Sequence, residues 1–348
     1  MNGVEPAECR HLLVCLPNWV GDVVMATPVL AALRRHFAGS RITYLMRDYV
    51  AEVVRGGGWH DDEVFWPPGR GWRREARLVR LSRELRRREV DLAILLTNSF
   101  RSALALWAGG ARRRVGYARD GRGPLLTDRL RPLRRGRRFV PSPVLDYYIR
   151  LAEHVGCAVP DRRLRLGISA AQRRAGEELL AHYGLSERRF AVINPGAAFG
   201  AAKCWLPERF AEVCDLLIEQ QRLVPVIVGA PNEYPLMRRI AELARRDPVC
   251  MCEPGTTLGS LKVVMQAASL LVCNDTGPRH YGIAFDVPTV TIFGPTHQEW
   301  TDTGYEREIK LQADVDCGPC QLPRCPLDLR CMERVTVEMV MDAVARLL

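Results

Sequence analysis

The sequence predicts an α/β protein that contains two doubly wound parallel sheets, one in each half of the chain. Short apolar runs typical of buried strands alternate with helical segments in both halves. Most of these runs end in a turn that contains Gly, Pro, Asn or Asp. The chain has 348 residues, which is enough for about two domains with a core each.

The first half opens with a βαβ unit. The sequence predicts a strand over 11–17, a helix over 23–37 and a second strand over 42–46. This succession forces a parallel pairing of the two strands through a right-handed crossover. The rest of this half is expected to hold an Arg-rich helix over 73–88, a buried strand over 90–97 and a long loop or pair of turns over 121–143.

The second half repeats the alternation. Four strands are expected, over 190–194, 223–228, 270–273 and 287–293. Four helices are expected, over 207–220, 233–245, 258–268 and 336–348. The predicted domains are therefore 1–167 and 168–348, and the terminal helix could pack back on the first. Ligands of such sheets bind beyond the carboxyl ends of the strands, so we expect a cleft between the domains.

Asp22 follows the first strand and a Gly-containing turn, at the start of the first predicted helix. A carboxylate in this position is stabilised by free backbone N–H groups and the helix dipole. It could therefore be a helix-cap residue, or it could be a general base that faces the cleft. The sequence leaves both interpretations open.

Two further strand ends carry groups suited to a nucleotide. The loop 194–203 is rich in small residues and ends in Lys203, one of only three lysines in the chain. Small residues let backbone N–H groups approach an anion, and a lysine adds a point charge, although an ordinary surface loop would look similar. Glu233 lies where an acid could hold ribose hydroxyls, or it is an acid that favours a helix start.

The segment 274–280 is the most informative strand end. Backbone N–H groups at Thr276 and Gly277 would open a helix and could bind a pyrophosphate. Asp275 could accept hydrogen bonds from sugar hydroxyls, and His280 could contact a ligand or serve only as a structural histidine. No Gly-x-Gly-x-x-Gly follows the first strand and no Walker sequence is present, which disfavours nicotinamide-dependent oxidoreductases and nucleotide-sugar epimerases.

Twelve cysteines in a chain without an apparent export signal predict reduced thiols in a cytoplasmic protein. No stretch of 18 uninterrupted apolar residues predicts a transmembrane helix. Four of the thiols, Cys317, Cys320, Cys325 and Cys331, lie within 15 residues. They could hold a structural zinc ion, or they could be thiols without a metal, since their spacing is not that of a standard zinc ribbon.

The formal net charge of +10 is concentrated in one region. Residues 70–140 contain 21 Arg and six acids, so the remaining chain carries a surplus of acids. The average charge suggests nucleic acid, an anionic membrane surface or a phosphorylated substrate. Acidic and small-residue motifs at strand ends argue against a nucleic-acid-binding protein. We interpret the region as a membrane-facing and acceptor-facing patch; a solvated charged face is the alternative.

Taken together, the motifs resemble glycosyltransferase family 9, and within it the subfamily of ADP-heptose:lipopolysaccharide heptosyltransferase II. The resemblance runs nearly end to end, with the motifs in family order. It rests on residues 17–25, 96–103, 114–117, 194–203 with Trp205, 275–277 with His280, and the four-cysteine cluster.

This resemblance implies a GT-B fold, in which the first domain binds the acceptor and the second binds the nucleotide-sugar. The implied reaction is an inverting transfer of L-glycero-D-manno-heptose from ADP-heptose to the inner-core heptose of a lipid A–Kdo precursor, with no required cofactor. The enzyme would be cytoplasmic and peripheral on the inner membrane. Heptosyltransferase I, or a family member with another donor sugar, is the alternative within the class.

The resemblance also assigns roles to individual residues. Asp22 matches the proposed base, Lys203 a donor-phosphate contact and Glu233 a ribose contact. Three neighbours, Asp275, Thr276 and Gly277, match the motif for sugar and pyrophosphate, with His280 beside them. The residues expected to bind the acceptor are Asn18, Trp19, Asn98 and Arg101.

Overall fold

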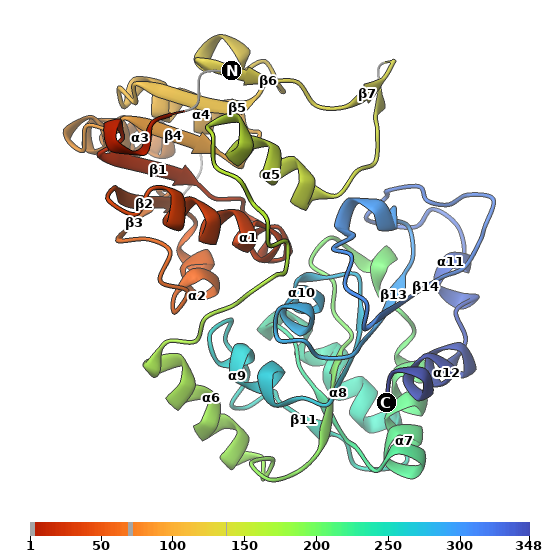
Figure 1. The fold of residues 1–348 in the computed structure, drawn as a ribbon. Coiled ribbons are helices and arrows are strands. Elements are labelled where there is room, and N and C mark those ends of the chain that lie inside the picture. The colour runs from red at the N-terminus through yellow and green to blue at the C-terminus, as the bar shows by residue number, and fades with distance from the viewer. Residues whose placement is uncertain (1–3, 69–71, 137) are drawn as a thin grey trace. The chain divides into compact units, whose positions relative to one another are not determined.

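The computed structural model describes residues 4–68, 72–136 and 138–348. The chain folds into two compact units, shown from red to yellow and from green to blue in Figure 1. The first unit comprises Met1–Arg163 and Glu299–Thr303, and the second comprises Leu164–Gln298 and Gly304–Leu348. Each unit contains one six-stranded sheet, and all neighbouring strands of both sheets are parallel.

The sheet of the first unit has the strand order β3-β2-β1-β4-β5-β6. Chain order reverses between β1 and β4, so the sheet is doubly wound as predicted. The central strand β1 is buried along its whole length, which explains why its sequence is continuously apolar. The six strands are β1 (His11–Cys15), β2 (Arg41–Met46), β3 (Asp62–Phe65), β4 (Leu92–Leu95), β5 (Arg113–Tyr117) and β6 (Asp128–Leu130).

Within the described part of this unit, the α-helices are α1 (Val20–His36), α2 (Ala51–Val54), α3 (Trp72–Arg87), α4 (Phe100–Ala108) and α5 (Val144–His154). Helix α4 begins after Ser99, whose side-chain oxygen accepts a hydrogen bond from the Ser102 N–H. The segment 121–143, predicted as a long loop or pair of turns, contains more regular secondary structure than expected. It contains the edge strand β6 and a short antiparallel pair, β7 (Arg134–Arg135) with β8 (Arg138–Phe139).

The sheet of the second unit has the order β11-β10-β9-β12-β13-β14, which is the same topology as in the first. Four of its strands match the predicted ones, and two short or outer strands were not predicted. The strands are β9 (Phe190–Asn194), β10 (Val224–Ile227), β11 (Val249–Cys250), β12 (Leu270–Asn274), β13 (Thr289–Phe293) and β14 (Glu308–Gln312).

The α-helices of the second unit are α6 (Ala170–His182), α7 (Pro207–Gln221), α8 (Tyr234–Leu243), α9 (Ser260–Ala267), α10 (Gly277–Ala284), α11 (Arg330–Glu333) and α12 (Val337–Leu347). Helix α6 starts with a capping box formed by Ser169 and Gln172. The terminal helix α12 packs against α7, β13 and β14, all within this unit. Its packing on the first domain, which the sequence left open, stays a prediction.

Candidate functional site

Asp22 lies in the first turn of α1, directly beyond the carboxyl end of β1. The cap position belongs to Trp19, which makes no side-chain cap bond, so Asp22 is not the cap residue. Its carboxylate is half-buried. Burial raises the pKa of the Tyr148 phenol on α5, and the negative charge of Asp22 raises it further. A carboxylate can take a proton from a hydroxyl group that reaches it.

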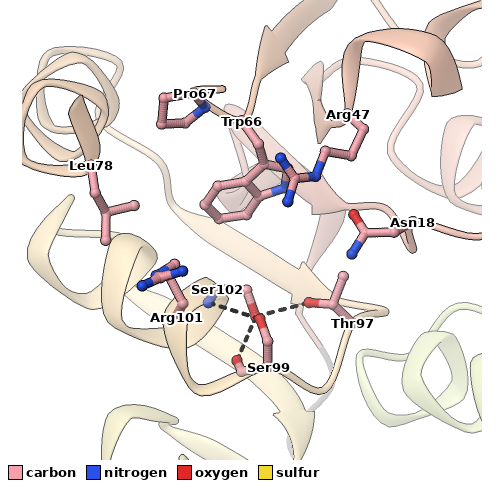
Figure 2. A pocket seen from close by; sticks show the side chains of 9 residues that line it. All are labelled: Asn18, Arg47, Trp66, Pro67, Leu78, Thr97, Ser99, Arg101 and Ser102. Atoms are coloured by element: carbon pink, nitrogen blue, oxygen red, sulfur yellow. Dashed lines mark hydrogen bonds between the residues drawn. The ribbon is translucent and has the colours of Figure 1, made fainter. Parts of the chain in front are cut away.

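A pocket of about 170 Å³ opens at the same edge of the first sheet (Figure 2). Its walls come from the carboxyl ends of the four neighbouring strands β3, β2, β1 and β4, from the start of α4 and from Leu78 of α3. Ligands of doubly wound sheets bind at this position. The lining residues are Asn18, Arg47, Trp66, Pro67, Leu78, Thr97, Ser99, Arg101 and Ser102.

Two guanidinium groups, those of Arg47 and Arg101, face this pocket, and the described lining contains no acidic residue. Arg47 is half-buried and its side chain forms no ion pair or hydrogen bond with any residue that the structure describes. A polar shelf lies opposite, where Thr97 donates to the Ser102 hydroxyl at 2.8 Å. The pocket is therefore suited to a polar ligand that carries a negative charge.

The structure brings some of the predicted acceptor residues together. Asn18 and Arg101 line the pocket, and Asn98 lies between two lining residues at the end of β4. Trp19 is 58% exposed and does not line it. The sequence analysis missed Arg47 and Trp66. Arg47 directly follows β2, which the sequence predicts, so the rule that led to the other strand ends would have found it. Trp66 directly follows β3, an edge strand that the sequence did not predict, so the rule could not have found it.

Lys203 and Asp275 meet in the second unit, beyond the carboxyl ends of β9 and β12. The Lys203 Nζ lies 2.5 Å from Asp275 Oδ2, and the Thr296 hydroxyl donates to the same oxygen at 2.9 Å. Burial alone would raise the pKa of Asp275. The charges of Lys203 and Arg279 and the hydrogen bonds outweigh burial, so the pKa is lowered and Asp275 is ionised.

Arg279 is fully buried and does not face a ligand from its side of α10. Its Nε and Nη2 donate to the two oxygens of Glu308 at 2.6 and 2.9 Å. Its Nη1 lies 3.3 Å from Asp275 Oδ1. Thr291 also donates to Glu308, at 2.6 Å. Arg279 therefore holds Asp275 in place from the buried side of α10.

The start of α10 carries the remaining residues of the predicted donor motif. Thr276 caps the helix in an extended conformation without a side-chain cap bond, and Gly277 is its first residue. His280 is 2% exposed, and its Nδ1 has no hydrogen-bond partner among the described residues. Burial, with the charge of Arg279, lowers the pKa of His280 to about 3, so the ring is neutral at physiological pH.

Glu233 lies over the ends of β9 and β10. Its Oε2 accepts a hydrogen bond from the Ala230 N–H at 2.8 Å. A Cβ atom at Gly196 would lie 2.0 Å from Glu233 Oε1, and one at Gly229 would lie 2.9 Å from its Oε2. Both glycines therefore leave room for this carboxylate. Glu233 also precedes α8, so it is both a residue at the helix start and an acid at the strand edge.

The four-cysteine segment packs beside the Lys203 loop. The Pro323 carbonyl accepts from the Ala202 N–H at 3.2 Å, and the Gln321 N–H donates to the Pro295 carbonyl at 2.8 Å. The four thiols differ in exposure: Cys317 and Cys320 are exposed, Cys325 is half-buried and Cys331 is buried. Among the residues with described coordinates, no group of three or more His, Cys, Asp or Glu could hold a metal ion. The structure thus gives no support to the predicted zinc site.

None of the helices in the described ranges combines the length and the apolar character that a bilayer crossing requires. The +15 surplus of residues 70–140 lies in the first unit. On α3, five of its arginines, Arg77, Arg80, Arg83, Arg86 and Arg87, are exposed and form no ion pair with a described residue.

The chain is similar to known proteins over nearly its whole length. The model of glycosyltransferase family 9 (heptosyltransferase) matches residues 78–329. Lipooligosaccharide heptosyltransferase 2 of Campylobacter jejuni subsp. jejuni serotype O:6 is 23% identical over 97% of this chain and 98% of its own. Lipopolysaccharide heptosyltransferase 2 of Salmonella typhimurium is 27% identical over 83% of this chain and 84% of its own.

A solved structure gives the same assignment for the fold. The structure of E. coli ADP-heptose lps heptosyltransferase II superposes with a TM-score of 0.79 at 21% identity, covering 97% of this chain and 98% of that one. The predicted fold class, two Rossmann-like parallel-sheet domains of the GT-B type, is confirmed. Since the family model covers more than half of the sequence, the chain belongs to glycosyltransferase family 9, the heptosyltransferases, and is a glycosyltransferase.

Proposed function

We propose that this enzyme transfers L-glycero-D-manno-heptose, with inversion, from ADP-heptose to the inner-core heptose of a lipopolysaccharide precursor. Its relatives in C. jejuni and S. typhimurium carry the name heptosyltransferase 2, and the E. coli structure is named for ADP-heptose and lipopolysaccharide. The observation that carries the proposal is the pairing of a cationic pocket and a carboxylate in one unit with a Lys203–Asp275 site in the other.

The donor binds at the strand ends of the second unit in this proposal. Lys203 and the backbone N–H groups at Thr276 and Gly277 bind the pyrophosphate. Glu233 holds the ribose hydroxyls from the edge of β9 and β10. Asp275 is only 5% exposed and both of its oxygens are occupied, so it serves the donor by holding Lys203. His280, buried and neutral, supports the same helix start.

Asp22 acts as the general base. It takes the proton of the acceptor hydroxyl while that oxygen attacks the anomeric carbon in line and the bond to ADP breaks. The departing diphosphate gains negative charge, which Lys203 and the start of α10 stabilise. These groups supply the charge that the reaction needs, so the proposed chemistry requires no cofactor.

The acceptor binds in the first unit. A Kdo-bearing lipid A precursor carries carboxylate and phosphate groups, and the pocket offers Arg47 and Arg101 without a neighbouring lining acid. Trp66 adds an apolar face of the kind that carbohydrate rings pack against. Asn18 and Asn98 supply polar contacts at the end nearest β1 and β4, and Trp19 is exposed beside them.

Transfer to defined acceptors tests this function. Purified enzyme would be given Kdo2-lipid A with and without one heptose, together with ADP-heptose, ADP-glucose or UDP-glucose. We expect product only from ADP-heptose and the heptose-bearing acceptor. Product on the acceptor without heptose would instead assign heptosyltransferase I activity, and turnover of another nucleotide-sugar would change the donor.

We also propose that α3 contacts the anionic cytoplasmic surface of the inner membrane. Its five exposed arginines lie on a helix that packs against α4, where Phe100 and Trp107 are 47% and 53% exposed. Basic residues near an anionic bilayer contribute about 1 kcal/mol each. A solvated charged face, with no membrane role, is the alternative.

Liposome sedimentation separates the two interpretations of this face. We expect the enzyme to bind vesicles that contain phosphatidylglycerol better than neutral vesicles, and R80Q/R83Q/R87Q to lose most of that preference. The matched control is R173Q/R174Q/R188Q, which removes three exposed arginines of the second unit. Equal partitioning onto both vesicle types would contradict the proposal. Tight, steeply salt-dependent DNA binding would revive the nucleic-acid alternative.

A further inference from the structure

Asn98 is held by two donors on a single side-chain oxygen. Arg122 Nη2 donates to Asn98 Oδ1 at 3.2 Å, and the Tyr147 hydroxyl donates to the same atom at 2.7 Å. A guanidinium has donors only, so the atom that faces Arg122 must be the oxygen of the amide. The Asn98 Nδ2 group therefore has one defined direction. Within the described residues it donates to nothing, and it is not a buried atom.

Arg122 is fully buried, yet it forms no ion pair with any carboxylate that the structure describes. Its three nitrogens donate to the Tyr117 carbonyl at 2.8 Å, to the Thr97 carbonyl and to Asn98. Burial lowers the pKa of Arg122. A charge that is desolvated without a carboxylate partner is costly to the fold. All three hydrogen bonds go to residues at or just after the carboxyl ends of β4 and β5, which indicates that Arg122 holds this edge of the sheet in place.

The surroundings of Arg122 explain a sequence motif that the proposed function does not use. Gly116 leaves space for the guanidinium, because a Cβ atom there would lie 3.1 Å from Arg122 Nη2. The Tyr117 ring stacks on the Tyr147 ring with centroids 3.5 Å apart, and the Tyr117 hydroxyl donates to the Tyr147 carbonyl at 3.0 Å. Gly116 and Tyr117, the last two residues of this motif, thus pack against the two residues that donate to Asn98.

The position of Asn98 connects this network to the acceptor pocket. Its two sequence neighbours, Thr97 and Ser99, both line the pocket, and Asn98 itself is half-buried between them. The Thr97 carbonyl is held by Arg122, and the Thr97 hydroxyl is held by Ser102. Arg122 and Ser102 therefore hold the residue that precedes Asn98, and the residues on both sides of Asn98 line the pocket.

We propose that Arg122 and Tyr147 are positioning residues that fix Asn98 as a hydrogen-bond donor, so that its Nδ2 donates to an oxygen atom of the acceptor that carries no hydrogen, such as a carboxylate, ring or glycosidic oxygen. This inference rests on the proposed function, because it places the acceptor in the first unit. Asn98 would then contribute to acceptor specificity. Its Nδ2 favours an acceptor whose atom facing it accepts a hydrogen bond, and it disfavours one whose facing group can only donate.

The variant N98D separates the donor from the network. Its carboxylate still accepts from Arg122 and Tyr147, so we expect a thermal midpoint equal to or above that of the wild type. The second carboxylate oxygen can only accept, so it repels the acceptor oxygen. We expect the acceptor KM to rise about tenfold or more with the affinity for ADP within about twofold. The control Q220E adds the same charge on the exposed face of α7.

A double-mutant cycle tests the positioning role. Y147F removes one donor to Asn98, and we expect the acceptor KM to rise about threefold. In an N98A background the same substitution should have no further effect on KM, because there is no amide left to orient. A merely structural role for Tyr147 would give the same change in both backgrounds and overturn the inference.

These measurements distinguish a failure of the proposed function from a failure of the inference about Asn98. If the wild type neither binds nor glycosylates the heptose-bearing Kdo2 oligosaccharide, the proposed function fails and the inference fails with it. If the wild type glycosylates this acceptor and N98D does so with an unchanged KM, the function stands and only the inference is overturned.

Discussion

The sheets of the two units share one strand order, but the charged side chains at the carboxyl ends of their strands are arranged differently. In the first unit, Arg47 and Arg101 line a pocket without a described acidic residue. In the second, Lys203 is paired with Asp275, Asp275 is paired with Arg279, and Arg279 is paired with Glu308. The topology thus fixes where a ligand binds, and the side chains after each strand decide which chemistry it meets.

Because of this difference, substitutions at the two sheet edges should have different consequences. The first edge holds Arg47, which a negatively charged ligand can neutralise without breaking a protein contact. The second holds a chain of alternating charges, in which Lys310 lies 3.9 Å from Glu308 and leaves one positive charge in excess. Substitutions in the first unit should therefore affect the acceptor and the reaction, whereas those in the second should affect the donor and the stability of the fold.

The largest effect is expected from Asp22→Asn. The amide cannot take the acceptor proton, so kcat should fall by about 10³-fold or more. ADP binding, measured by calorimetry, should stay close to the wild type because Asp22 belongs to the first unit. Asp247→Asn, at an exposed position of the second unit, is the matched control. Wild-type turnover in Asp22→Asn would remove the base from this edge and break the division of roles.

Arg279→Met should give the largest loss of stability. Glu308 would stay buried with only Thr291 and the more distant Lys310 as partners, and breaking a buried ion pair of this kind costs about 3–5 kcal/mol. Urea unfolding measures the free energy. Removing both charges with Arg279→Met/Glu308→Met should recover part of the loss. A cost below about 1 kcal/mol for the single variant would show that the network does not stabilise the second unit.

Lys203→Ala tests whether Lys203 in the second unit binds the phosphates of the donor. Asp275 keeps Arg279 as a partner, so the fold should survive, while the donor loses one charge-assisted contact to its phosphates. We expect the affinity for ADP to fall by about 10- to 100-fold, with the acceptor KM unchanged. Lys203→Arg keeps the charge and should lose less. Calorimetry with ADP is the measurement, and an unchanged dissociation constant would contradict the phosphate role.

The sequence predicts the central strands of both sheets better than the outer ones. Strands β1, β4, β9 and β12 are buried along their whole length, so their apolar runs are unambiguous. The edge strand β3 buries only Val64 of its four residues. Without a continuous apolar run, and with few residues for alternation, such a strand resembles a loop.

The same limit applies to the site. The proximity of Lys203 and Asp275 follows from the strand order, since β9 and β12 are neighbours in the sheet. The pairing of Arg279 with Glu308 does not follow, because it needs the register of β14 on β13. Likewise, no local pattern marks Arg122 as the residue that holds Asn98, 24 positions before it.

Arg47→Ala tests the open character of the first edge. Its guanidinium makes no ion pair within the described chain, so the thermal midpoint should change little. The acceptor should lose one charge-assisted contact, with a rise in KM of about tenfold and unchanged ADP affinity. Arg83→Ala removes an exposed arginine of α3 away from the pocket lining and serves as the control. An equal KM for both variants would contradict an anion site at this pocket.

The smallest effect is expected from the titration of His280. Burial lowers its pKa to about 3, whereas the unfolded chain titrates near 6.5. Below about pH 6.5 the unfolded state therefore binds a proton that the folded state does not, and stability falls as the pH falls. Between about pH 6.5 and 5.5 this linkage amounts to about 1 kcal/mol.

His280→Gln should flatten the pH dependence of unfolding in this window, measured by urea titrations at several pH values. His182→Gln, on the last turn of α6, is the matched control for the loss of a histidine. If His280→Gln leaves the slope unchanged, the ring is already protonated beside Asp275. The second edge would then carry a further positive charge for the donor, and the contrast between a neutralised network and an open cationic pocket would be weaker.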